Sequence, residues 1–315
     1  MKRGPGSPGG VLLLLLAAVL VSVLATSDCR GESTGARQAD RPHVTLATAK
    51  NLWNALSLVA LANGYFAQEG LDVEAQYLQG GRYCLDALLS GSANFANIGE
   101  VNVADLGYTG NEDVRVIGTI VSSDSSAIIG KRSAGITKPE DIRGKRLALS
   151  PGMTSEIFAY RFLERYGIAP SDVEIVRIQP LAMQGTMIGD GADAASTWEP
   201  FIHNIRQSLG ENSVVFTGPE IFTGYEFLAV RNSWAREHPR EVEAFLRANR
   251  RAASYIKEHP QEAQAIVAQA INLDLPIVTA IWDQFDMLLT LDSAALTNDL
   301  TREGHGGLGG LLILL

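Results

Sequence analysis

The sequence predicts an α/β protein built from two lobes, and the order of its apolar segments is the first reason. Short β-branched runs alternate with helical segments from residue 44 onward, and the same alternation begins again at residue 146. Strands that alternate with helices are typical of βαβ units and of mainly parallel sheets. Length is the second reason, because a chain of 315 residues accommodates two such series at about 150 residues per domain.

The first series starts with a strand at 44–48, and a helix at 52–63 follows it. That helix is apolar on nearly every face, which predicts a buried helix, and Gly64 ends it. The other elements alternate in the same way: a strand at 73–78, a helix at 83–89, and strands at 93–98, 114–121 and 127–129.

The second series has the same rhythm. Its predicted elements are strands at 146–149, 173–178 and 194–197, with helices at 154–166 and near 181–188 between them. From Arg236 onward the pattern is helical, because apolar and small residues recur on one face: Val242, Phe245, Asn249, Ala252 and Ile256.

Two segments are expected to carry the chain between the lobes, the first of them polar and glycine-containing. The stretch 122–135 is the predicted crossing into the second lobe, and 213–218 is the predicted return. They divide the chain into a first lobe of residues 43–126 and 217–300 and a second lobe of residues 127–216. Ligands of open α/β sheets bind at the carboxyl ends of the strands, so we expect a ligand cleft between the lobes.

The first 27 residues are typical of an export signal. Two basic residues precede an apolar run at 11–24, which is shorter than the roughly 20 residues that a membrane-spanning helix needs. Small residues at 25–27 predict cleavage after Ser27, and residues 28–42 read as a flexible tether. Cys29 leaves a lipid anchor open beside soluble export, although Asp28 stands where a lipobox has a small residue. Both alternatives place the protein in the periplasm.

The composition argues against nucleic acid as a partner. The chain has 26 Lys and Arg against 35 Asp and Glu, and a net charge of −9 repels a phosphate backbone. Two cysteines and five scattered histidines predict neither a disulfide framework nor a metal site. The nucleophile-elbow, zinc-protease and P-loop patterns are missing from the sequence, so we predict no catalytic residue and no cofactor.

Four motifs occur in a characteristic order. They are GYFAQEGLDVE at 64–74, GG at 80–81 with ALLSGSANF at 87–95, KPEDIRGKR at 138–146, and WEP at 198–200. Together they resemble periplasmic substrate-binding proteins of ABC importers of the nitrate/sulfonate/taurine type, which share a domain family with thiamine-pyrimidine synthases.

The resemblance covers residues 44–290 and implies a two-lobed, periplasmic-binding-protein-like (type II) fold. It also implies a monomer that captures a small-molecule solute and delivers it to a membrane permease and its ATPase. Two features depart from the family pattern. Asn94 stands where an Asp is common, and residues 301–315 form an atypical low-complexity, apolar tail.

Several candidate ligand contacts favour an anion. Thr154 and Ser155 begin a predicted helix, whose free N–H groups and positive dipole end attract negative charge. The same two residues would cap the helix without any ligand. Arg82, just after the Gly pair, is a natural clamp for a carboxylate or sulfonate, as is Lys50, yet both are equally compatible with solvated surface residues.

The other candidates lie after predicted strands. Gly99 would permit close backbone approach, while Glu100 would either recognise an amine or stabilise a helix N-terminus. Aromatic, amide, hydroxyl and acidic side chains complete the set: Trp53 and Asn54 after the first strand, Ser122 and Ser123 at the lobe junction, Trp198 and Glu199 in a strand-to-helix turn, and Tyr225 beyond the return. Trp53 fits the core equally well.

These contacts favour a small sulfonate such as taurine, because it has an anion, an amine and a short carbon body. Nitrate ranks lower, since it would leave both tryptophans without a partner. Three alternatives stay open: a neutral, pyrimidine-like solute, an enzyme of the thiamine-pyrimidine-synthase type, and a sensor ectodomain. The cysteine-rich motif of the synthases has no counterpart in this sequence.

Processing of the leader is directly testable. N-terminal sequencing of the exported protein is expected to start at Asp28, or at an acylated Cys29 if the chain is lipid-anchored. A mature protein that retains the apolar residues 12–16 would contradict both forms of this prediction.

Overall fold

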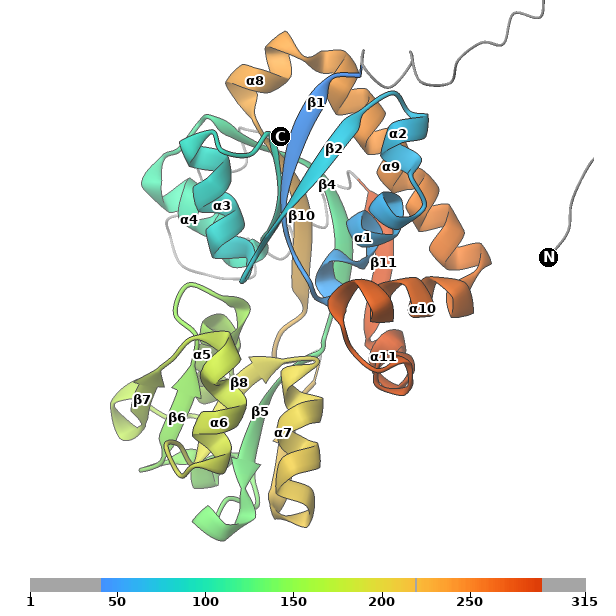
Figure 1. Ribbon diagram of the computed structural model, residues 1–315. Coiled ribbons are helices and arrows are strands. Elements are labelled where there is room, and N and C mark those ends of the chain that lie inside the picture. Colours follow the sequence, from blue (N-terminus) through green and yellow to red (C-terminus); the bar gives the residue numbers. More distant parts are fainter. Residues whose placement is uncertain (1–40, 219, 291–315) are drawn as a thin grey trace, which may run out of the picture. The chain divides into compact units, whose positions relative to one another are not determined.

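The computed structural model describes residues 41–218 and 220–290, which form two α/β lobes (Figure 1). The predicted signal peptide, most of the tether and the low-complexity tail lie outside the described residues. The first lobe is built on a six-stranded sheet of order β11-β4-β10-β3-β1-β2, and the second on a five-stranded sheet of order β7-β6-β8-β5-β9. The predicted fold class, an α/β chain with two sheets, is confirmed.

The first sheet combines a parallel half with an antiparallel half. β1 (His43–Ala49), β2 (Asp72–Leu78) and β3 (Phe95–Gly99) are parallel. The antiparallel strands are β4 (Val114–Ser123), β10 (Gly224–Arg231) and β11 (Phe285–Thr290). Since β1 and β3 end at the same edge, the loops that follow them lie together at the boundary with the second lobe.

Helices cover both faces of the first sheet (Figure 1). One face carries α3 (Gly81–Ser90) and α4 (Glu100–Thr109). The other face carries mainly α1 (Ala55–Ala62), α9 (Pro239–Glu258) and α10 (Pro260–Ile271). Shorter helices complete the lobe: α2 (Tyr65–Gln68), α8 (Asn232–Glu237) and α11 (Leu275–Ile281).

The second lobe has the same layered plan on a smaller scale. Its strands are β5 (Ser126–Lys131), β6 (Arg146–Leu149), β7 (Glu174–Arg177), β8 (Ala194–Trp198) and β9 (Ser213–Phe216). On one face α5 (Thr154–Arg165) buries Phe158 and Phe162. On the other face lie α6 (Met183–Ile188) and α7 (Phe201–Leu209).

Two connections differ from the sequence-based expectation. The first crossing is not the whole stretch 122–135, because β4 ends at Ser123 and β5 begins at Ser126. Residues 213–216 are not part of the return but form β9, the edge strand beside β5. Backbone hydrogen bonding to neighbouring strands holds both segments in the second sheet.

Several elements of the first lobe were not predicted from the sequence, among them α4, β10 and β11. β10 is a central strand of a sheet that helices cover on both faces, so most of its residues are buried and the alternation of polar and apolar residues is lost. β11 lies inside the stretch that reads as helical, and its pairing with β4 joins residues about 160 positions apart in sequence.

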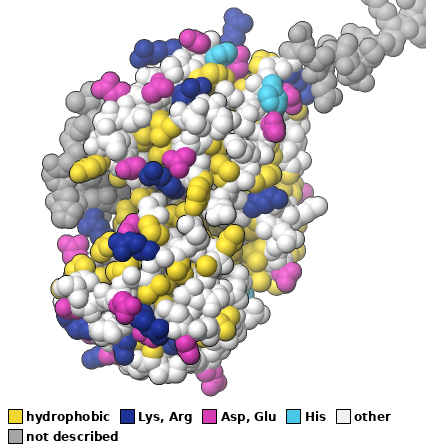
Figure 2. All heavy atoms as spheres, turned by 60° about the vertical axis from the view of Figure 1, so that its left-hand side comes forward, with side chains coloured by type: hydrophobic (Ala, Val, Ile, Leu, Met, Phe, Trp, Pro, Cys, Tyr) yellow, Lys and Arg dark blue, Asp and Glu magenta, His cyan; other side chains and the backbone are white. Residues whose placement is uncertain are grey.

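Within the described ranges no single helix is long and apolar enough to cross a membrane, although the bent pair Pro260–Ile271 and Leu275–Gln284 passes that test jointly. The same ranges contain no group of three or more His, Cys, Asp or Glu residues that could hold a metal ion. Acidic and basic side chains are interspersed over the face of the molecule drawn in Figure 2.

The core of the first lobe is centred on Phe245 of α9. Its ring stacks on Phe95 at 3.8 Å between centroids and on Phe66 at 4.8 Å, and all three side chains are buried. One turn further along α9, Asn249 accepts a hydrogen bond from Ser57 of α1 and donates one to the Phe245 carbonyl. These contacts attach α9 to the sheet and to α1.

Phe245→Ala is expected to lower the free energy of unfolding by about 3–5 kcal/mol, because it leaves a cavity at the centre of the aromatic stack. Urea unfolding followed by circular dichroism measures this loss. Tyr108→Ala removes a ring that is 85% exposed and is expected to change stability by less than about 0.5 kcal/mol. Equal losses in the two variants would contradict the assignment of this core.

Candidate functional site

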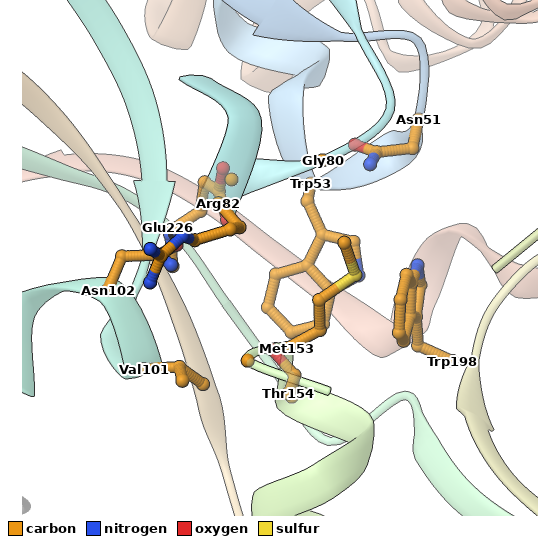
Figure 3. A pocket seen from close by; sticks show the side chains of 13 residues that line it. Asn51, Trp53, Gly80, Arg82, Val101, Asn102, Met153, Thr154, Trp198 and Glu226 are labelled. Carbon is orange, nitrogen blue, oxygen red and sulfur yellow. Dashed lines mark hydrogen bonds between the residues drawn. The ribbon is translucent and has the colours of Figure 1, made fainter. Parts of the chain in front are cut away.

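A cavity lies between the two lobes, with about 450 Å³ of space when its open mouth is included (Figure 3). Both lobes contribute side chains and backbone to its wall. The lining residues are Asn51, Trp53, Gly80, Gly81, Arg82, Gly99, Val101, Asn102 and Glu226 of the first lobe and Gly152, Met153, Thr154 and Trp198 of the second.

Three helices begin at this cavity. Gly80 and Gly81 start α3, Gly99 immediately precedes α4, and Thr154 is the first residue of α5. The first turn of a helix has backbone N–H groups without intrahelical partners and carries the positive end of the helix dipole. Three such helix starts at one cavity create a positive electrostatic potential there without any lysine side chain. Such a potential is suited to binding an anion.

Glycine at position 81 permits the starts of α3 and α4 to pack closely. A Cβ atom on Gly81 would lie 2.6 Å from Asn102 Oδ1, which is closer than side chains tolerate, and 3.0 Å from the Gly99 nitrogen, which is tighter than most Cβ contacts. Asn102 Oδ1 in turn accepts a hydrogen bond from the Gly99 N–H at 3.1 Å and caps α4. The glycine pair is therefore a packing requirement of the cavity wall.

Two tryptophans and a methionine form the apolar part of the wall (Figure 3). Trp53 is held edge-to-face against Phe285, and Trp198 edge-to-face against Phe201. Met153 approaches Gly80 from the opposite lobe, so that a Cβ at Gly80 would lie 3.3 Å from its Cε. These fixed rings are suited to the short carbon body of a ligand.

Glu226 is an acid in the wall of this cavity. It lies on β10 opposite Gly99 of β3, and its residue is only 8% exposed. Burial raises the pKa of the Glu226 carboxyl well above its usual range, and the nearby charge of Glu100 raises it further. Burial disfavours the charged form, so this carboxyl stays protonated over a wider pH range than a carboxyl in water.

Glu100 joins the lobes. Its Oε1 accepts a hydrogen bond from Thr154 Oγ1 across the cleft at 2.9 Å, and its Oε2 accepts one from the Tyr225 backbone N–H at 2.8 Å. A second bond crosses the cleft nearby, from the Tyr83 hydroxyl to Gln179 Oε1 at 2.8 Å. The lobes are therefore in contact on one side of the cavity, through bonds that opening would break.

Five of the residues singled out from sequence line the cavity: Trp53, Arg82, Gly99, Thr154 and Trp198. Arg82 is also engaged by acids, since its Nη1 lies 3.1 Å from Asp105 and its Nε 3.5 Å from Asp86. Both pairs are about half exposed and therefore weak. Lys50, in contrast, lies over the ring of Tyr77.

The other predicted residues are not in the cavity wall, and their hydrogen bonds are made within the protein. Asn54 donates to Asn51 Oδ1, the Ser155 hydroxyl exchanges bonds with Ser150, and Ser123 donates to the Gln284 carbonyl. Ser122 lies next to it in β4.

Tyr225 and Glu199 also have internal partners. The Tyr225 ring stacks on Phe227. Glu199 accepts a hydrogen bond from the His203 N–H and caps α7; burial raises the pKa of its carboxyl, and this hydrogen bond opposes the rise.

Sequence reasoning missed eight lining residues. Gly80, Gly81, Gly152 and Met153 belong to the glycine-containing turns that drew attention to Arg82 and Thr154, so their own positions were within reach. Asn51, Val101 and Asn102 lie next to predicted residues. Glu226 had no signal, because its strand was not recognised.

Comparison with known proteins identifies the family. A family model described as NMT1/THI5 like matches residues 54–263, two thirds of the chain. The chain belongs to the NMT1/THI5-like family. Its relatives include the taurine-binding periplasmic protein of Escherichia coli, 30% identical over 59% of this chain and 58% of that protein. A putative aliphatic sulfonates-binding protein of Bacillus subtilis is 26% identical over 70% of this chain and 68% of that protein.

The alignment thus spans less than two thirds of the taurine-binding relative.

The fold of this chain is also similar to that of solved structures. The alkanesulfonate-binding protein SsuA from Xanthomonas axonopodis, bound to MOPS, superposes with a TM-score of 0.73 at 15% identity, over 83% of this chain and 91% of that one. The desulfurization enzyme DSZB superposes with a TM-score of 0.60 at 16% identity, over 87% and 92%. At these identities the likeness concerns the fold alone.

Thr154→Val removes the hydrogen bond to Glu100 and is expected to shift the ligand-free protein toward an open arrangement of the lobes. A hydrogen bond worth about 0.5–1.5 kcal/mol changes that equilibrium roughly 2- to 10-fold. The radius of gyration from solution X-ray scattering is expected to rise relative to the wild type.

Thr186→Val is the matched control, because the Thr186 hydroxyl donates only to Ala182 within the second lobe. An unchanged radius in Thr154→Val, or the same increase in both variants, would show that the Thr154 bond does not hold the lobes together.

Proposed function

We propose that this protein is the solute-binding component of an ABC importer and that its solute is a small sulfonate or a closely related anion. The observation that carries the proposal is the arrangement of the cavity, at which α3, α4 and α5 all begin and which two tryptophans also line. The helix ends attract the anionic group, and the rings contact the carbon body.

The relatives support the same solute class, since their names state that they bind taurine or aliphatic sulfonates. The taurine-binding relative is periplasmic, which agrees with the export signal expected at residues 1–27. We therefore assign the protein to the outer side of the cytoplasmic membrane, with a permease and its ATPase as partners. Whether Cys29 carries a lipid is a separate question, which the sequencing of the mature N-terminus addresses.

Capture in this proposal is a change of lobe arrangement without turnover. A solute that touches the starts of α3 and α4 in one lobe and α5 in the other stabilises the arrangement in which the lobes meet. The hydrogen bonds from Thr154 to Glu100 and from Tyr83 to Gln179 also stabilise the arrangement in which the lobes meet. The permease would then recognise the surface that the two lobes form together.

Ethanesulfonate is expected to bind with one molecule per chain and to leave unchanged after incubation. At a hundredfold excess over its dissociation constant it stabilises the fold by about 2.7 kcal/mol, because it binds the folded state alone. Titration calorimetry and thermal unfolding measure the two quantities, with nitrate, acetate and uracil as competitors. Stabilisation by uracil alone would refute the anion assignment, and chemical conversion of the sulfonate would refute capture without turnover.

Trp198→Ala is expected to weaken ethanesulfonate binding by about 10-fold or more, because it removes apolar contact with the carbon body. Trp234→Ala is the matched control, since Trp234 packs on Phe95 and His238 in the first lobe. An equal loss of affinity in both variants would indicate a general loss of stability instead of a contact.

A further inference from the structure

Glu226 is the one acid among the described residues that line the cavity. Across residues 41–218 and 220–290 its side chain forms no hydrogen bond and no ion pair, although the residue is only 8% exposed. Buried carboxyl groups are normally hydrogen-bonded or paired, because desolvation without a partner is unfavourable. Figure 3 draws Glu226 among the residues that line the cavity.

The charged side chains Glu100 and Arg82, which also lie near the cleft, form hydrogen bonds or ion pairs with other residues. Glu100, from α4, accepts hydrogen bonds from Thr154 and from the Tyr225 backbone. Arg82, from α3, pairs with Asp86 and Asp105. Cys84, also on α3, is a buried thiol whose pKa is raised by burial and by the charge of Glu226.

Gly99 leaves the carboxylate accessible from the cavity. It pairs with Glu226 in the sheet, and a Cβ on Gly99 would lie 3.6 Å from Glu226 Oε2. A larger side chain there would occupy the space beside the carboxylate. Because Gly99 has no side chain, this space is left for a ligand atom next to Glu226.

We propose that Glu226, which lies beside the start of α4, binds a positively charged amine of the solute, so that the natural ligand is a small zwitterion whose anionic end lies at the starts of α3 and α5. The inference rests on the proposed function, since both ends of the ligand occupy the same cavity. An ammonium group supplies the charge and the N–H donors that this carboxylate lacks. The acid and the helix ends then recognise opposite ends of one short molecule.

Binding of an amine involves a proton at Glu226. Without a ligand, burial keeps the Glu226 carboxyl protonated at pH values above the usual pKa of a glutamate. An ammonium ion beside it favours the carboxylate, so the carboxyl proton passes to solvent while the ammonium keeps its own protons. A net release of up to one proton per bound amine follows, in the pH range below the raised pKa.

The same acid makes the empty protein less stable as the pH rises. The folded state keeps the Glu226 proton after the unfolded chain has lost it, so stability declines from the ordinary carboxyl pKa upward until the raised pKa of the folded state is reached. Glu226→Gln removes this titration. The gain in melting temperature of the ligand-free variant over the wild type is therefore expected to increase between pH 5 and pH 8.

The decisive experiment compares ligand pairs that differ only in an amine: taurine with ethanesulfonate, and β-alanine with propionate. Calorimetry on the full-length mature protein is expected to show taurine binding at least 10-fold more tightly than ethanesulfonate. Glu226→Gln is expected to abolish this advantage while ethanesulfonate binds as before. Titration of taurine in two buffers of different ionisation enthalpy measures the released proton.

Glu199→Gln is the matched control, because Glu199 is the other buried acid with a raised pKa, and an amide oxygen still accepts the His203 N–H. It is expected to retain the full preference for taurine. Equal affinities within each pair in the wild type, or a preference that survives in Glu226→Gln, would overturn the amine assignment while leaving the sulfonate proposal intact. Binding by the carboxylate pair alone, with a preference for β-alanine, would instead overturn the sulfonate proposal and support the amine site. Failure of all four compounds to bind would refute both.

Discussion

The site depends on one constraint, the parallel order of the strands around each lobe's centre. β2 and β3 run parallel to β1 in the first lobe, and β6 runs parallel to β8 in the second. The helices α3 and α4, which follow β2 and β3, therefore start at the same edge of the first sheet, and α5 follows β6. The starts of α3, α4 and α5 consequently meet at one cavity. Backbone N–H groups and dipoles supply its positive potential, and this explains how an acidic chain with a net charge of −9 can present a site suited to an anion.

The acids near the cleft differ in role because they differ in partners. Glu100 bonds to Thr154 and to the Tyr225 backbone and holds the lobes together, while Glu199 caps α7. Glu226 is equally buried but has no such bond. Glu100 and Glu199 were candidate ligand contacts from the sequence, whereas Glu226 was not. The residue types alone did not discriminate among them, since all three are glutamates next to predicted or actual strand ends.

The fold was predictable to the extent that it follows from local pattern. Alternating β-branched and helical segments predicted the strands β1 to β8 and the helices α1, α3, α5 and α6, and two sheets follow from two such series. β10 and β11 were not predicted, because each pairs with strands distant in sequence and neither shows a strict alternation. The crossings were misplaced because the stretches 122–135 and 213–218 include residues of β4, β5 and β9, which interstrand hydrogen bonding holds in the sheets.

The sequence by itself determined the α/β class, the family resemblance and the glycine-rich turns from which α3 and α5 begin, because these depend on local periodicity and on residues with special backbone freedom. Only the tertiary structure decided which side chains share the cavity. Trp53 and Trp198 lie in different lobes, and Glu226 reaches the site on a strand that returns to the first sheet after the whole second lobe. Such proximity arises from strand pairing over more than a hundred residues, and no local pattern in the chain encodes it.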